Sequence, residues 1–152
     1  MSDLSDLYQE VILDHTRHPH HYGKMATADR EAKGHNPLCG DQITVYLKME
    51  GDRIADVQFE GNGCAISKSS ASVMTDTVIG RSVTDVQSIF EKFQHMVTGQ
   101  SDETLSADSA TEKLAVFAGV SEFPTRVKCA VLAWHTLRSA LENKTPKNIS
   151  TE

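Results

Sequence analysis

Residues 41–64 read DQITVYLKMEGDRIADVQFEGNGC, and this stretch decides the fold class. Its first half alternates strictly between apolar and polar side chains, which is typical of a half-buried β-strand. The apolar positions that share one face are Ile43, Val45, Leu47 and Met49. A turn at residues 50–52 follows, and a second alternation then runs through Ala55, Val57 and Phe59. The pattern predicts an antiparallel hairpin with one covered face.

Helices are predicted on both sides of this hairpin, because apolar residues recur there at helical spacing. The predicted helices cover residues 4–15, 65–80, 82–99, 114–118 and 124–141, with Ser82 and Pro124 at two of the starting positions. The polar residues 18–35 read as a loop, and residues 100–111 read as a polar surface insertion. Strands followed by helices indicate an α+β domain, with helices packed on a small antiparallel sheet.

The bulk composition fits one globular domain spanning residues 1–152, with enough chain to bury a core. The net charge of −6 disfavours nucleic acid and anionic membranes as partners, because both attract basic surfaces. The first residues do not resemble a secretory signal, and no stretch approaches transmembrane length. An odd count of three cysteines also argues against a disulfide scaffold, so we expect a cytoplasmic protein.

Three cysteines and one aspartate are the candidate metal ligands: Cys39, Asp41, Cys64 and Cys129. Cys39 and Asp41 share the parity of Ile43, so both should project from the covered face of the sheet. Three thiolates and a carboxylate complete a tetrahedral zinc site if the fold brings them together. Taken singly, Cys39 and Cys129 are more often small buried hydrophobes. Cys64 follows Gly61-Asn62-Gly63 near a helix N-terminus, a position that favours a thiolate.

Two further groups of polar residues are weaker signals. Arg126 and Lys128 could stabilise thiolate charge near Cys129, or could simply lie on an exposed helix face. Histidines occupy positions 15, 18, 20 and 21, and adventitious metal binding is one interpretation of the last three. A role on the surface of a polar loop is the interpretation we favour for them.

Three cysteine motifs stand in order along the chain: NPLCGD at 36–41, GNGCAIS at 61–67 and PTRVKCA at 124–130. An N-terminal signature precedes them, made by Tyr8, Ile12, Asp14, His15, Pro19 and Gly23. Together these segments resemble the IscU-type iron–sulfur assembly proteins, over residues 4–142. Lys128 stands where the classical scaffold branch has a histidine, and FPTRV at 123–127 replaces that branch's chaperone-recognition segment. These features, with the polar insertion, are similar to the zinc-dependent sulfurtransferase branch, SufU.

The resemblance implies a three-stranded antiparallel sheet covered by five to six helices. It implies a zinc ion held by Cys39, Asp41, Cys64 and Cys129, with Cys39 as the catalytic residue that accepts persulfide sulfur. The implied partners are a SufS-type cysteine desulfurase and downstream iron–sulfur assembly proteins. Two alternatives remain open at this point. One is a scaffold whose thiolates hold an iron–sulfur cluster in place of zinc, and the other is a structural zinc-binding module.

Overall fold

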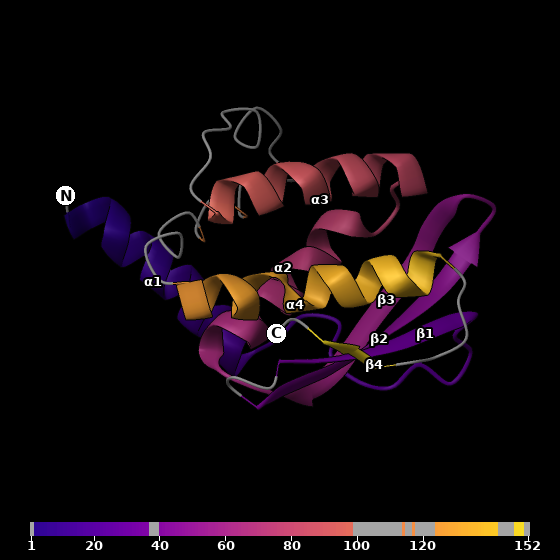
Figure 1. Ribbon diagram of the computed structural model, residues 1–152, viewed down its shortest axis with the longest axis horizontal. Coiled ribbons are helices and arrows are strands. Elements are labelled where there is room, and N and C mark those ends of the chain that lie inside the picture. The colour runs from indigo at the N-terminus through magenta and orange to yellow at the C-terminus, as the bar shows by residue number, and fades with distance from the viewer. Residues whose placement is uncertain are drawn as a thin grey trace.

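The computed structural model describes residues 2–36, 40–98, 114, 117, 124–142 and 148–150. Its elements follow the chain as α1 (Ser2–Arg17), β1 (Arg30–Asn36), β2 (Asp41–Glu50), β3 (Arg53–Asn62), α2 (Ala65–Val78), α3 (Val83–Val97), α4 (Pro124–Leu141) and β4 (Asn148–Ser150). The strands form one sheet in the order β3-β2-β1-β4 (Figure 1). The architecture is therefore α+β, as the sequence predicted.

The three-stranded antiparallel sheet is confirmed, and it gains a short edge strand. β1 and β3 both pair antiparallel to β2, whereas β4 pairs parallel to β1. The described ranges contain four α-helices, fewer than the five to six expected. The predicted helix at 114–118 falls mostly outside those ranges, although Leu114 and Phe117 are fully buried. The predicted insertion at 100–111 also lies outside the described residues.

One prediction about the sheet was wrong, because part of the polar segment 18–35 is not a loop. Its last residues form β1, where Ala32, Gly34 and Asn36 alternate as the buried positions. A Cβ at Gly34 would lie 2.1 Å from the hydroxyl oxygen of Thr136 on α4. The buried positions of the strand carry small residues because α4 lies directly on them. Without large apolar side chains at these positions, the sequence does not show the apolar alternation that marks a strand.

The predicted hairpin is confirmed, with one correction to its second strand. Val45 pairs with Phe59 and Leu47 with Val57, so their side chains share the buried face. The register then shifts at Lys48/Met49, which leaves Ala55 as an extra, exposed residue in β3. This is a β-bulge, and it brings Ile54 into the core in place of Ala55.

Helices α2 and α4 cover one face of the sheet, α1 packs on α2, and α3 packs on α4 (Figure 1). The stripe predicted for α3 is buried as a set: Val86, Ile89, Phe90, Phe93 and Val97. Ser82 caps this helix through its side chain, which accepts a hydrogen bond from the Asp85 amide. Phe93 and Phe90 stack on Trp134 of α4, with ring centroids 5.3 and 5.9 Å away. The aromatic layer joins α3 to α4 and fixes α4 above the sheet.

None of the helices in the described ranges combines the length and apolar character needed to span a lipid bilayer.

Candidate metal centre

Three of the four predicted ligands come together at one end of the sheet. Asp41 is the first residue of β2, Cys64 immediately precedes α2, and Cys129 lies in the second turn of α4. One ligand atom from each lies within 4.8 Å of the other two. Asp41 and Cys129 are fully buried, and Cys64 is half-buried. Residues distant in sequence thus form a single cluster of two thiols and a carboxylate.

The Asp41 carboxylate is held in place by the backbone that precedes α2. Its Oδ1 accepts a hydrogen bond from the Cys64 amide at 2.8 Å, and its Oδ2 lies 3.8 Å from the Cys64 Sγ. A Cβ at Gly63 would lie only 2.7 Å from Oδ1. Glycine is therefore required at 63 by this close approach, and the buried carboxylate is satisfied in part by a backbone donor.

Cys64 is the N-cap of α2, as its predicted position before a helix suggested. Its Sγ accepts a hydrogen bond from the Ser67 amide at 3.4 Å. The free amides at a helix N-terminus carry partial positive charge, which stabilises a thiolate there. The side chain is half-buried and so remains partly accessible.

Cys129 meets a residue that the sequence interpretation did not single out. The Asn36 amide Nδ2 donates a hydrogen bond to the Cys129 Sγ at 3.7 Å, and both residues are fully buried. Asn36 opens the motif that contains Cys39, so its type was visible in sequence. Its role has no local sequence signal, because β1 lacks the apolar alternation of a strand and only that strand places Asn36 against α4.

Cys39 lies outside the described residues, and its predicted role as ligand and sulfur acceptor stays a prediction. Asn36 and Gly40, which bound the undescribed segment 37–39, are both described. Asn36 pairs with Asp41, and the Gly40 amide donates to the Asn36 carbonyl at 2.8 Å. Gly40 has φ of +74°, a left-handed conformation that favours glycine. The undescribed segment 37–39 therefore lies between Asn36, which contacts Cys129, and Asp41, which is a member of the cluster.

The donor set suits zinc. Thiolate sulfur and carboxylate oxygen are both zinc ligands, and buried sites of this composition are usually four-coordinate. Three described donors leave one position for a fourth, and two Cα–Cα steps of about 3.8 Å separate Asp41 from Cys39. Arg126 is exposed and Lys128 is half-buried on α4, beside Cys129 in sequence.

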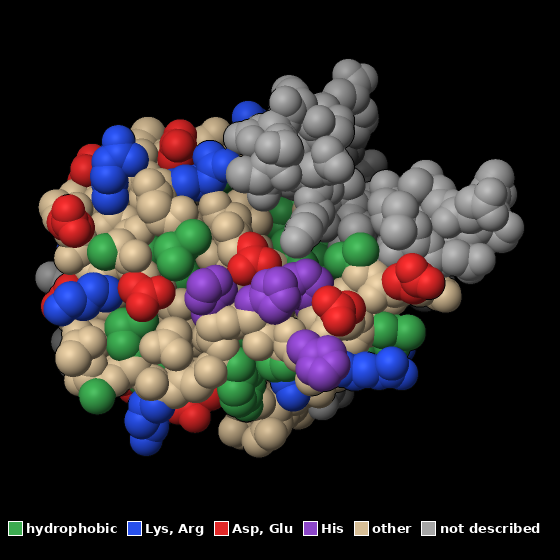
Figure 2. All heavy atoms as spheres, turned by 180° about the vertical axis from the view of Figure 1, so that it is seen from behind, with side chains coloured by type: hydrophobic (Ala, Val, Ile, Leu, Met, Phe, Trp, Pro, Cys, Tyr) green, Lys and Arg blue, Asp and Glu red, His purple; other side chains and the backbone are tan. Residues whose placement is uncertain are grey.

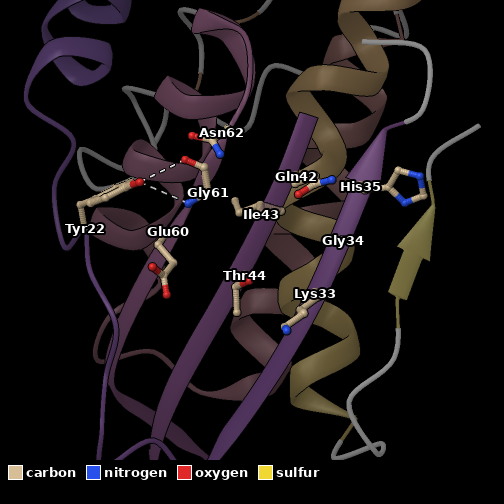
Figure 3. A pocket seen from close by; sticks show the side chains of 10 residues that line it. All are labelled: Tyr22, Lys33, Gly34, His35, Gln42, Ile43, Thr44, Glu60, Gly61 and Asn62. Carbon is tan, nitrogen blue, oxygen red and sulfur yellow. Dashed lines mark hydrogen bonds between the residues drawn. The ribbon is translucent and has the colours of Figure 1, made fainter. Parts of the chain in front are cut away.

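A separate pocket of about 520 Å³ lies on the sheet face that α2 and α4 leave open (Figure 3). Its lining includes Lys33, Gln42 and Glu60, whose positions alternate along the strands with those of the buried core residues. The Tyr22 hydroxyl closes one side by donating to the Gly61 carbonyl at 3.0 Å. Gln42 follows Asp41 directly, so the pocket and the metal cluster lie on opposite faces at the same end of β2.

Two thiols and a carboxylate at the end of a small helix-covered sheet form a candidate metal site in an α+β domain. The chain belongs to the family described as the NifU-like N-terminal domain, whose model matches residues 7–130. It is 39% identical to the iron–sulfur cluster assembly scaffold protein IscU of Streptococcus pyogenes serotype M1, over 93% of this chain and 87% of that protein. It is 35% identical to the zinc-dependent sulfurtransferase SufU of Bacillus subtilis, over 92% of each chain.

A solved structure agrees with this assignment. The crystal structure of a putative iron–sulfur cluster assembly scaffold protein for the SUF system, from Fervidobacterium islandicum AW-1, superimposes with a TM-score of 0.80. It is 35% identical and covers 87% of this chain and 94% of that one. The predicted membership of the IscU-like family and the predicted fold are therefore confirmed.

Proposed function

We propose that this protein is a zinc-dependent sulfurtransferase of iron–sulfur cluster assembly, which accepts sulfur on Cys39 from a SufS-type cysteine desulfurase. The observation that carries the proposal is the convergence of Asp41, Cys64 and Cys129, with ligand atoms within 4.8 Å of one another. A carboxylate in this set, and Lys128 where the classical scaffold branch has a histidine, both favour the sulfurtransferase branch. The similarity to the Bacillus subtilis protein supports the same choice.

Zinc held by Cys39, Asp41, Cys64 and Cys129 would keep the three thiols deprotonated and order the segments that carry them. The surrounding residues are arranged to support that state. The Cys64 amide holds Asp41, the Ser67 amide donates to Cys64, and the Asn36 amide donates to Cys129. Each of these three ligands is therefore oriented by a hydrogen bond from a neighbouring group, as is common for metal ligands in proteins.

The sulfur transfer itself is a thiol exchange at Cys39. The Cys39 thiolate attacks the outer sulfur of the desulfurase persulfide, and a new sulfur–sulfur bond forms as the old one breaks. The desulfurase cysteine leaves as a thiolate with the bonding electron pair, so no external oxidant or reductant is consumed. The product is a persulfide on Cys39, which downstream iron–sulfur assembly proteins would receive. Arg126, exposed on α4, is available to contact the desulfurase.

The test is the rate of alanine production by a SufS-type desulfurase with cysteine and reductant. Zinc-loaded wild type should stimulate it strongly, whereas Cys39→Ala and metal-stripped protein should not. Glu91→Gln, an exposed change on α3, serves as the matched control and should stimulate like wild type. Peptide mass analysis should find one added sulfur on Cys39 after a single turnover. Normal sulfur acceptance by Cys39→Ala would refute the role given to that residue.

A second candidate is an assembly scaffold, which the similarity to the Streptococcus pyogenes protein favours. The same thiolates could ligate iron, and the cluster would then be cargo. Failure of every form to stimulate the desulfurase, with cluster formation on the protein during iron and sulfide reconstitution, would establish this candidate. Failure of both assays, with zinc loss unfolding the protein, would leave a structural zinc-binding module.

A further inference from the structure

The open face of the sheet carries polar side chains in two rows that run across its strands. In the register of β1, β2 and β3, Lys33 lies beside Thr44, and Thr44 lies beside Glu60. Two positions further along the strands, the same pairing forms a second row, made by His35, Gln42 and Asn62. All six residues line the pocket of about 520 Å³ (Figure 3). Its volume lies in the range of about 300–1,000 Å³ that is typical of sites for small ligands.

Opposite charges stand at the two ends of the first row. Neighbouring strands lie about 4.8 Å apart, so the backbone positions of Lys33 and Glu60 are separated by about 10 Å. Thr44 is half-buried between them and carries a neutral hydroxyl. Lys33 is exposed and Glu60 is half-buried, and within the described ranges no ion pair joins these two side chains. The row therefore presents a positive group on β1 and a negative group on β3, and neither neutralises the other.

A buried tyrosine orients the negative end of this row. The Tyr46 hydroxyl donates a hydrogen bond to Oε1 of Glu60, and Tyr46 is only 5% exposed. Burial and this hydrogen bond raise the pKa of Tyr46, so its hydroxyl stays protonated and keeps donating at neutral pH. A carboxylate has two acceptor oxygens, so Oε2 of Glu60 remains for a donor on a ligand. The protein thus fixes this carboxylate before any ligand binds.

The charge of the lining argues against several classes of ligand. The charges of Lys33 and Glu60 balance and the whole protein carries a net charge of −6, so an anion such as phosphate would gain little here. Acidic and basic side chains are also interspersed on the face that Figure 2 shows, without a broad patch of either sign. A hard metal ion needs several oxygen ligands, whereas Glu60 is the only carboxylate among the described lining residues. The lining fits a polar ligand that carries one charge of each sign.

We propose that this pocket binds a zwitterionic peptide of two or three residues. Its terminal ammonium group would lie against Glu60 and its terminal carboxylate against Lys33. An extended chain advances about 3.3 Å per residue, so three residues match the separation of about 10 Å, and two suffice when both side chains reach inwards. A free amino acid is too short, because both of its charged groups are attached to one carbon atom. The peptide amides would meet the second row, where His35, Gln42 and Asn62 offer donors and acceptors.

The experiment titrates triglycine into the full-length protein and follows the backbone amide resonances. Those of Thr44 and Gly61 should shift and saturate, whereas those of α3, which lies beyond α4 on the covered side of the sheet, should not. N-acetyl-triglycine lacks the ammonium group and triglycine amide lacks the carboxylate, so each should bind about 10-fold more weakly. Free glycine should also bind more weakly than triglycine. None of the predicted zinc ligands lines the pocket, so the result does not depend on the proposed function.

Two substitutions assign the ends of the peptide. Lys33→Met should bind triglycine and triglycine amide equally, because the partner of the carboxylate is gone. Glu60→Gln should bind triglycine and N-acetyl-triglycine equally, and its amide oxygen can still accept the hydrogen bond from Tyr46. Each variant should bind triglycine about 10-fold more weakly than wild type. Lys92→Met and Glu91→Gln on α3 are the matched controls and should bind as tightly as wild type.

The wild-type comparison of free and capped peptides decides the question even if a variant unfolds. Absence of saturable shifts at millimolar triglycine would overturn the proposal, as would equal binding of the free and capped peptides. Glycine or inorganic phosphate binding as tightly as triglycine would overturn it too, because the pocket would then hold an amino acid or an anion. The same is true if these resonances shift with protein concentration alone, since a second copy of the chain would then cover this face.

Discussion

Replacing Gly63 with alanine should damage the cysteine cluster without touching any of its ligands. The added Cβ would lie 2.7 Å from Oδ1, 3.0 Å from Cγ and 3.2 Å from Cβ of Asp41. Three short contacts along one side chain cannot be relieved by turning its tip alone. Asp41 is fully buried, so the carboxylate must shift and its hydrogen bond from the Cys64 amide must lengthen or break.

The magnitude follows from two terms. A hydrogen bond to a charged group contributes about 1.5–3 kcal/mol, and overpacking a buried position costs about 1–3 kcal/mol. Since relaxation relieves one term at the expense of the other, we expect the free energy of unfolding to fall by about 2–4 kcal/mol. Zinc affinity should fall about 10–100-fold, the range typical when a group that orients a metal ligand is lost.

The assay is urea denaturation of the metal-free protein, together with zinc competition against a chromophoric chelator. Gly80→Ala is the matched control, because a Cβ there meets nothing within 4 Å but the residue has φ of +83°. That variant should lose about 1–2 kcal/mol from backbone strain and keep its zinc affinity. A Gly63→Ala protein whose zinc affinity stays within twofold of wild type would refute the assignment of Asp41 as a ligand positioned through Gly63.

Three other substitutions test the packing of the core and the pH dependence of stability. Gly34→Ala should lower the free energy of unfolding by about 1–3 kcal/mol or more, since its Cβ would lie 2.1 Å from the Thr136 hydroxyl; urea denaturation measures this, and unchanged stability would refute the β1–α4 contact. Phe93→Ala should cost about 3–5 kcal/mol in the same assay, and a loss under about 1 kcal/mol would contradict its burial. Burial and Glu60 raise the pKa of Tyr46, so the folded state holds this proton more tightly than the unfolded chain. Stability should therefore fall as pH rises above about 10, and Tyr46→Phe should remove that part of the pH dependence.

Amphipathic periodicity predicted the helices well, because a helix that buries one face must place apolar residues at matching intervals. The α3 stripe and the Ser82 cap are both local patterns, and both were confirmed. β1 was missed because its burial depends on α4, which lies about a hundred residues further along the chain. Ala55 was misplaced for a related reason, since a β-bulge inverts the alternation and leaves no local signal of its own.

In the candidate site, too, the features with a local sequence pattern could be predicted and the long-range contacts could not. Asp41 could be placed on the covered face from parity alone, and Cys64 near a helix start from its two preceding glycines. The contacts that orient them could not be predicted, because they join residues with no common pattern. Asn36 reaches Cys129 across 93 positions, and Ser72 reaches His15 across 57. Only the packing of α4 on β1 and of α1 on α2 brings these pairs together.

Helix α2 places small polar residues in the core, and these residues join it to both of its neighbouring helices. Its buried face carries Ser67, Ser69, Ser70 and Ser72, a composition that would ordinarily argue against a core helix. Small side chains let neighbouring helices approach closely, and each hydroxyl then needs a partner. Ser70 donates to the Ala130 carbonyl of α4 at 2.6 Å, one residue from Cys129. Ser72 meets α1 through His15. The bond from Ser70 therefore ties α2 to α4 beside Cys129, and the contact of Ser72 ties α2 to α1, so one serine-rich helix holds both of its neighbouring helices.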